Sequence, residues 1–296
     1  MNPAEKYRIL EQIDANKKRK FAHIFLTENK ISGVKSILKT IQKTEDNQVV
    51  QDRLRKEASF SFIVDGLPET LDFFESDSEI FLFKSFQTGI TLGDYLEQFR
   101  SKEKPQKLFE VLEELEPILE HIHQNKIYHL DIKPGNIIVD SSKGIRVSLI
   151  DFGLALNKNE PDTRKTLFPL GFAAPELLLN QLDLVDPRTD YFALGVSCWT
   201  CLQGRMPLID PNPSITTNLQ LTYPLPSLDS KYKAFNGALQ KMSAKHQFTL
   251  PPNKLNAEEL KTALQKGMNR RYNSYKEFLS DFENQLSSQK KSWWPF

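Results

Sequence analysis

The stretch His129-Leu130-Asp131-Ile132-Lys133-Pro134-Gly135-Asn136 is the part of this chain that decides its fold. It places a carboxylate, an ammonium group and a carboxamide close together, and Asp151-Phe152-Gly153 follows fifteen residues after Asn136. A carboxylate can orient a hydroxyl group and accept its proton, and oxygen-bearing side chains can hold hard metal ions. We therefore interpret the stretch as a catalytic loop and not as an ordinary surface loop.

Together the two motifs resemble the catalytic loop and the magnesium motif of the eukaryotic-type protein kinases. In that family a carboxylate accepts the proton of the attacking hydroxyl, and metal ions neutralise charge on the phosphates. The resemblance implies that Asp131 is the base, that Asn136 holds one Mg²⁺, and that Asp151 bridges Mg²⁺ to the β- and γ-phosphates of ATP. Lys133 would contact the γ-phosphate, and the Asp-x-Lys-Pro-x-Asn form resembles the serine/threonine branch of the family.

Upstream, the segment from Gly33 to Lys39 resembles the third strand of the family, whose lysine pairs with the α- and β-phosphates. Lys39 is expected to be that lysine. Arg55-Lys56-Glu57-Ala58 resembles the helix that supplies its partner, so Glu57 is the expected glutamate. Lys35 and Lys43 are alternatives that keep the charge, although Lys39 best fits the distance from Gly33.

Three further motifs lie downstream in the family order. Ala174-Pro175-Glu176 resembles the end of the activation segment, and Arg271 stands where the family has the arginine that pairs with this glutamate. Asp190, at the start of an apolar helix, is implied to tether the backbone of the catalytic loop. The resemblance therefore extends from about Tyr7 to Leu286.

The nucleotide-covering loop departs from the family pattern, because the segment from Ile13 to Ala22 contains no glycine. Glycine normally lets backbone amides approach the phosphates closely. Ile24 aligns with the valine that covers adenine, which makes the loop about three residues longer than usual. Either the basic run Lys17 to Lys20 supplies positive charge through its side chains, or it is an exposed hairpin tip that only aids solubility.

Other positions also differ from the usual family residues. Ile37 lies where the family usually has a small alanine in the adenine pocket, and either Phe83 or Lys84 guards the back of that pocket. Leu130 replaces the arginine that in many kinases binds a phosphorylated activation loop, so a phosphate there would lack this partner. Pro169 replaces a threonine that contacts the catalytic aspartate in many serine/threonine kinases.

Hydrophobic patterning indicates an α+β fold with a β-rich front and a mainly helical back. Expected strands cover residues 7–10, 22–26, 36–39, 71–74 and 80–83, and expected helices cover 46–60, 105–125, 190–202, 257–268 and 274–286. Between 210 and 256 the prolines predict loops around one short helix at 232–242. We assign 1–286 to a two-lobed protein kinase domain, with an N-lobe 1–85 and a C-lobe 86–286, followed by a basic and aromatic tail at 287–296.

The composition excludes some classes of protein. The 39 Lys and Arg residues nearly balance 38 Asp and Glu residues, so no global field favours nucleic acid or an acidic membrane surface. No apolar stretch is long enough for a membrane span and no signal core is visible, so a cytoplasmic protein is expected. The two cysteines, Cys198 and Cys201, lie in an apolar helix and are expected in the core, not in a metal or redox site. The family resemblance adds ATP, Mg²⁺ and a protein substrate, with the chain itself as a further candidate acceptor.

Two other functions stay open at this point. A pseudokinase that acts as a scaffold or switch is motivated by the missing glycines and by Ile37. Against it, the residues that the family uses for nucleotide binding and catalysis are all present: Lys39, Glu57, Asp131, Asn136 and Asp151. A small-molecule kinase of the aminoglycoside or choline type shares the catalytic aspartate and asparagine, but such enzymes lack the Ala-Pro-Glu segment. We therefore expect an active serine/threonine protein kinase.

Overall fold

The computed structural model describes residues 3–13, 22–160, 168, 170–248 and 250–292. The chain divides into two compact units, of which the first comprises Met1–Thr88 and Ser148–Ala155 and the second comprises Gly89–Val147 and Leu156–Phe296. The segment that carries Asp151 therefore belongs to the first unit, although it follows the catalytic loop in sequence.

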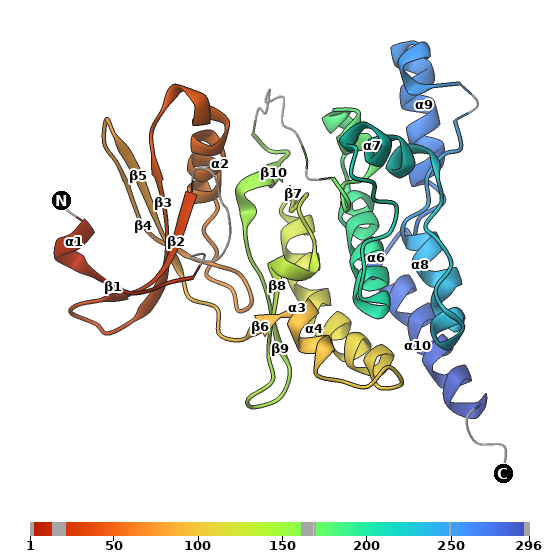
Figure 1. Cartoon of the computed structure of the whole chain (residues 1–296), viewed down its shortest axis with the longest axis horizontal. Helices are drawn as coiled ribbons and strands as arrows, with labels where there is room; N and C mark the ends of the chain where they lie inside the picture. Colours follow the sequence, from red (N-terminus) through yellow and green to blue (C-terminus); the bar gives the residue numbers. More distant parts are fainter. Residues whose placement is uncertain (1–2, 14–21, 161–167, 169, 249, 293–296) are drawn as a thin grey trace. The chain divides into compact units, whose positions relative to one another are not determined.

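The first unit is built on a five-stranded antiparallel sheet with the strand order β1-β2-β3-β5-β4 (Figure 1). Its strands are β1 (Tyr7–Gln12), β2 (Ala22–Asn29), β3 (Lys35–Gln42), β4 (Thr70–Glu75) and β5 (Glu79–Ser85). A short helix, α1 (Pro3–Lys6), precedes the sheet, and the predicted turn before β3 contains Gly33 at a φ of 69°. Alternation in the sequence predicted the first three strands, and short apolar runs predicted β4 and β5.

The two faces of this sheet carry different side chains. On one face, Ile41, Ile80 and Leu82 pack with Leu54 of helix α2 (Gln48–Ser59), which follows the 3-10 turn η1 (Glu45–Asn47). On the other face, Phe83 stacks on Tyr7 with ring centroids 3.9 Å apart. Because successive side chains of a strand alternate between the faces, Lys84 lies on the same face as Leu82.

The second unit is mainly helical. Its helices are α3 (Leu92–Glu97), α4 (Lys104–Gln124), α5 (Pro175–Leu178), α6 (Pro187–Gln203), α7 (Pro213–Thr222), α8 (Asn236–Met242), α9 (Ala257–Met268) and α10 (Tyr275–Ser292). The predicted apolar stripe of α4 is buried, and α4 packs against α10 while α6 packs against α8 (Figure 1). Helix α6 is buried on nearly every side and contains Cys198 and Cys201, which are both buried free thiols.

Short strands and turns frame the catalytic loop. In the second unit β6 (Ile90–Thr91) pairs with β8 (Ile137–Asp140), and β7 (Ile127–Tyr128) pairs with β10 (Leu156–Asn157). Strand β9 (Arg146–Leu149) follows β8 in the order β6-β8-β9 and contains the boundary between the units. The 3-10 turns are η2 (Pro134–Asn136), η3 (Phe152–Leu154), η4 (Leu182–Leu184), η5 (Ser230–Phe235) and η6 (Pro252–Lys254). The catalytic loop thus runs from the end of β7 through η2 to the start of β8, so it is fixed at both ends by strands.

The segment between 210 and 256 is more regular than the sequence predicted. We expected loops around one short helix, but α7 precedes η5 and α8. Helix α7 begins with Pro213 in its first turn, where the missing N–H of proline costs nothing, and the side chain of Asn212 accepts a hydrogen bond from the backbone N–H of Ser214. The proline that was read as a breaker is therefore a helix start.

The described residues contain no helix with both the length and the hydropathy of a bilayer span. Helix α10 continues to Ser292, and the aromatic residues 293–296 lie outside the described part of the chain.

Candidate active site

In the first unit, Lys39 meets two carboxylates. Its Nζ donates to Oε1 and Oε2 of Glu57, each at 2.7 Å, and to Oδ1 of Asp151 at 3.1 Å. Of the two alternatives to Lys39, Lys35 is exposed and Lys43 pairs with Glu75. The structure therefore brings together the predicted lysine and glutamate.

The positions of these groups follow from the local structure. Lys39 lies on the face of β3 that α2 covers, and Glu57 is buried on the inner side of α2. Burial alone would lower the pKa of Lys39, but the negative charges of Asp151 and Glu57 outweigh it and raise this pKa above its ordinary value. Lys39 is thus protonated and positively charged at neutral pH.

Asp151 is held in an unusual backbone conformation. Its φ is 70° and its ψ is 72°, in the left-handed region that non-glycine residues rarely adopt. The next residue, Phe152, is fully buried and packs against Phe60 and Phe62, with ring centroids 5.8 and 4.8 Å away. Packing of the neighbour therefore fixes the direction of the carboxylate, whose side chain stays 34% exposed.

In the second unit, Asp131 is the centre of the catalytic loop. Its Oδ2 accepts hydrogen bonds from Nζ of Lys133 at 2.7 Å and from Nδ2 of Asn136 at 3.0 Å. Nδ2 of Asn136 also donates to the backbone oxygen of Asp131 at 2.8 Å. The other carboxylate oxygen, Oδ1, is buried and finds no hydrogen-bond partner among the described residues. One oxygen is thus held by the loop and the other is left as an acceptor.

Asp190 at the start of α6 holds the backbone of this loop. Its carboxylate accepts hydrogen bonds from the backbone N–H of His129 at 2.9 Å and of Leu130 at 2.8 Å, and it contacts Nε2 of His123 at 2.8 Å. Burial would raise the pKa of Asp190, but the hydrogen bonds and the histidines lower it below its ordinary value. Leu130 is strained at a φ of 60°, and its bond to Asp190 helps to maintain that conformation.

A buried ion pair between Arg271 and Glu176 stabilises the second unit. Nη1 and Nη2 of Arg271 donate to the two carboxylate oxygens of Glu176 at 2.6 and 2.9 Å, and Nε donates to the backbone oxygen of Ala244. Both side chains are almost completely buried. This bidentate geometry avoids an uncompensated charge, which would cost about 3–5 kcal/mol if one partner were removed.

Comparison with known proteins identifies the family. The protein kinase domain matches residues 19–275. The chain belongs to the protein kinase family. It is 28% identical over 209 residues to the serine/threonine-protein kinase PrkC of Bacillus subtilis, covering 68% of this chain and 31% of that protein. It is 28% identical over 214 residues to the carbon catabolite-derepressing protein kinase of Candida tropicalis, covering 71% of this chain and 34% of that protein. The matches span about a third of the length of these relatives.

The kinase family uses ATP and Mg²⁺, and the oxygen donors present fit this metal. Mg²⁺ is usually bound by one or two carboxylates together with substrate phosphates and water, not by a cage of protein ligands. The ranges that the structure describes contain no cluster of three His, Cys, Asp or Glu side chains that could hold a metal ion. Asp151 and Asn136 offer a carboxylate and a carboxamide oxygen respectively.

The pairing of β3 with its neighbours decides between Phe83 and Lys84, which the sequence left open. Ile24 lies opposite Lys39, and Ile37 lies opposite Lys84 in the pairing of β3 with its neighbours. Lys84 is 3% exposed, and its Nζ donates to the backbone oxygen of Phe60 at 2.5 Å and to Oγ1 of Thr70 at 2.8 Å. Lys84, and not Phe83, therefore lies on the face of the sheet that carries Lys39. The two-residue period of β5 was the signal that could have shown this.

Several predicted features fall outside the described residues. These are the basic run Lys17 to Lys20 and Pro169, and the two threonines between the Asp-Phe-Gly and Ala-Pro-Glu motifs that could be phosphorylated, Thr163 and Thr166, also lie outside them.

Proposed function

We propose that this kinase transfers the γ-phosphoryl group of ATP to serine or threonine hydroxyls of a protein. The observation that carries the proposal is the state of Asp131, whose Oδ1 is buried and unpartnered among the described residues while Oδ2 is held by Lys133 and Asn136. A buried acceptor without a donor is costly unless another molecule supplies the donor. An acceptor hydroxyl of a substrate would supply it.

In the proposed reaction, Oδ1 of Asp131 orients the substrate hydroxyl and accepts its proton. The hydroxyl oxygen forms a bond to the γ-phosphorus as the bond from that phosphorus to the oxygen of ADP breaks. Lys133, with a side chain 32% exposed, offers positive charge to the γ-phosphate. Because the transition state is mostly loose, positioning and electrostatics supply most of the rate enhancement, and turnover is expected at about 1–100 s⁻¹.

Lys39 is proposed to contact the α- and β-phosphates, where Glu57 keeps its ammonium group in place, and Ile24 is proposed to cover adenine. Asn136 and Asp151 would hold Mg²⁺, which when bound neutralises charge on the phosphates. Asp151 also contacts Lys39 at 3.1 Å, so the same carboxylate orients a cation within the protein.

The serine/threonine preference rests on Lys133 and on the names of the relatives. Lys133 contacts the catalytic carboxylate at 2.7 Å, as the Asp-x-Lys-Pro-x-Asn motif of the serine/threonine branch suggests. The activity of the whole protein, its protein substrates and any autophosphorylation are part of the proposal.

Transfer of label from γ-labelled ATP tests the function. The purified protein is incubated with Mg²⁺ and either a generic basic protein, a mixed lysate, or a set of sugars and amino alcohols, and the labelled amino acids are then identified. We expect labelled serine and threonine, no transfer after removal of Mg²⁺, and none with Asp131→Asn. Transfer to the small molecules alone would support a small-molecule kinase, and no transfer to any acceptor would support a pseudokinase.

A further inference from the structure

Helix α2 has little hydrophobic anchoring of its own. It comprises twelve residues, and of its three buried side chains, Gln51, Leu54 and Glu57, one is apolar, while Val50 and Ala58 are partly buried against the same core. Helices of this length are marginal in isolation, and packing of an apolar face usually holds them in place. With so small an apolar face, the position of α2, and with it that of Glu57, depends in part on polar contacts.

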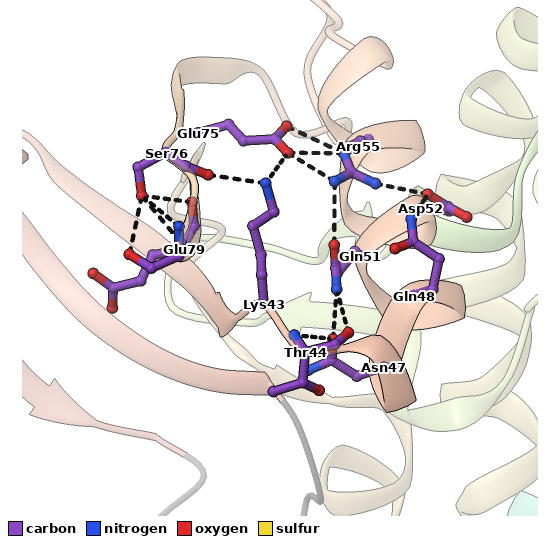
Figure 2. A network of polar contacts seen from close by, with 11 residues as sticks. Lys43, Thr44, Asn47, Gln48, Gln51, Asp52, Arg55, Glu75, Ser76 and Glu79 are labelled. Atoms are coloured by element: carbon purple, nitrogen blue, oxygen red, sulfur yellow. Dashed lines mark hydrogen bonds and ion pairs between the residues drawn. The ribbon is translucent and has the colours of Figure 1, made fainter.

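The sheet provides a fixed carboxylate next to this helix. Glu75 ends β4, and its Oε1 accepts a hydrogen bond from Nζ of Lys43 at 3.0 Å (Figure 2). Lys43, just after β3, also donates from Nζ to the backbone oxygen of Ser76 at 2.9 Å and from its backbone N–H to that of Ser78 at 2.7 Å. The carboxylate is thereby fixed to the sheet from the side of β3.

Arg55 of α2 binds this carboxylate with a multidentate contact. Its Nε lies 3.2 and 3.1 Å from Oε1 and Oε2 of Glu75, and its Nη2 lies 2.7 Å from Oε1 (Figure 2). The guanidinium is itself oriented by Oδ1 of Asp52 at 2.7 Å and by Oε1 of Gln51 at 3.2 Å. Exposed ion pairs often contribute little to stability, but planar bidentate pairs within a network are the exception.

A second tether holds the beginning of the helix. Nε2 of Gln51 donates to the backbone oxygen of Thr44 at 2.9 Å and to Oδ1 of Asn47 at 2.6 Å, and Nδ2 of Asn47 donates to the backbone oxygen of Gln42 at 2.7 Å. These contacts fix the start of α2 to the end of β3. The Arg55 contact fixes the later part of the helix, where Glu57 lies.

We propose that the ion pair between Arg55 and Glu75 holds helix α2 in position. In this position Glu57 keeps its contact with Lys39 even when the activation segment carries no phosphate. Arg55 and Glu57 are two residues apart and thus lie on opposite sides of the helix. The contact with Glu75 therefore limits rotation and displacement of α2 on the side away from Lys39. The role of the pair in catalysis rests on the proposed function, whereas its effect on α2 does not.

Two observations agree with this role. Hydrogen bonds from Arg55 and then Lys43 lower the pKa of Glu75 to about 2, so the pair stays charged at every pH at which a kinase would work. Leu130 carries no charge with which to bind an activating phosphate. A phosphate contact through this residue therefore cannot position α2, and the ion pair between Arg55 and Glu75 provides a contact that needs no phosphate. Arg55 and Glu75 are positioning residues in this proposal, because they act on Lys39 through the position of α2 and of Glu57.

The test compares Arg55→Gln and Glu75→Gln with a matched control pair. Arg8 and Glu28 form an ion pair at 2.6 Å between β1 and β2, in the same unit but away from α2. We expect each variant of the Arg55 pair to lower kcat/KM for ATP about tenfold, the double variant to lose no more than either single variant, and Arg8→Gln to stay within about twofold of wild type. Equal activity of Arg55→Gln and Arg8→Gln would overturn the proposal.

A second comparison separates positioning from general stability. In a Glu57→Gln background, Arg55→Gln should cause no further loss of kcat/KM, because a residue that acts through Glu57 has nothing left to position. A further loss of about tenfold in that background would mean that Arg55 acts by another route, and the proposal would fail.

Amide hydrogen exchange tests the same device without any measurement of activity. In Glu75→Gln, the amides of Gln48–Ser59 should exchange about tenfold faster, whereas those of β2 and β3 should not change. If the wild-type protein transfers no phosphate but the amides of α2 still exchange faster in Glu75→Gln than in wild type, the proposed function fails and the role of the ion pair in holding α2 stands. If exchange in α2 is the same in Glu75→Gln, Arg8→Gln and wild type, the tether itself is refuted.

Discussion

Lys84 lies opposite Ile37 in the pairing of β5 with β3 and buries its ammonium group against the backbone oxygen of Phe60. No carboxylate forms a direct ion pair with it in the described residues. Burial lowers its pKa to about 8 from the ordinary 10.5, with Glu57 and Glu69 acting in the opposite direction and Lys39 in the same one. A buried lysine of this kind makes stability depend on pH.

We predict that Lys84→Met is more stable than wild type at pH 7, by about 1–3 kcal/mol. The change removes a buried charge, and Phe60 keeps a partner, because Oγ1 of Thr70 also donates to its backbone oxygen at 3.0 Å. Because the folded-state pKa of Lys84 is depressed, the unfolded chain binds more protons between about pH 8 and 10.5, and wild-type stability rises with pH in this window.

The advantage of Lys84→Met should therefore shrink between pH 7 and pH 9.5. Urea unfolding of both proteins at the two pH values measures it, with Lys35→Met, at an exposed position of the neighbouring strand β3, as the control. A variant that is less stable than wild type at pH 7 would show that the hydrogen bonds of Lys84 outweigh the cost of its burial.

We predict that Asp131→Asn abolishes phosphoryl transfer and leaves folding and ATP binding nearly unchanged. The carboxamide keeps the shape of the side chain and an oxygen for the contacts with Lys133 and Asn136, but it cannot accept the proton. Rates with the labelled-ATP assay and a melting curve with Mg-ATP measure the two effects. Asp183→Asn is the control, since this carboxylate is exposed and pairs with Lys261 at the surface. Residual transfer within about tenfold of wild type would contradict the role of base.

We predict a different result for Asp151→Asn, which should weaken Mg-ATP binding as well as turnover. The change removes a charged metal ligand and one of the two carboxylates that raise the pKa of Lys39. Titration with nucleotide in the presence and absence of Mg²⁺ measures the affinity, and Asp131→Asn serves as the comparison. Unchanged affinity with Mg²⁺ present would show that Asp151 is not a metal ligand.

The sequence predicted the strands of the first unit and most helices because their apolar residues repeat with the period of the structure. The catalytic motifs were visible because their chemistry requires fixed residue types at fixed spacings. Helix α7 was missed since Pro213 can end a helix or begin one, and only the cap at Asn212 distinguishes the two. The pairing of Arg55 with Glu75 could not be predicted at all, because it depends on where β4 ends in space relative to α2.

We predict that the kinase is active without phosphorylation of its activation segment. Leu130 cannot bind a phosphate, and Glu57 already contacts Lys39. Thr163→Ala and Thr166→Ala, both in a segment outside the described residues, should each keep most of the activity of wild type in protein treated with a phosphatase. A loss of about a hundredfold, restored when the segment is phosphorylated, would contradict this prediction.

Our last prediction concerns the basic run from Lys17 to Lys20, which lies outside the described residues. If its side chains replace the missing glycine amides, the replacement of all four residues, Lys17, Lys18, Arg19 and Lys20, by serine should raise the KM for ATP. The rise should be smaller at high salt, because charges on exposed side chains act through a field with a Debye length of about 8 Å at physiological ionic strength. ATP kinetics at low and high salt measure both effects, and replacement of the exposed Lys30 and Lys35 by serine, compared with replacement of Lys17 and Lys18 alone, is a control with the same change in net charge. An unchanged KM under both conditions would make the run a solvated hairpin tip, and phosphate binding would then depend on Lys39 and the metal ligands alone.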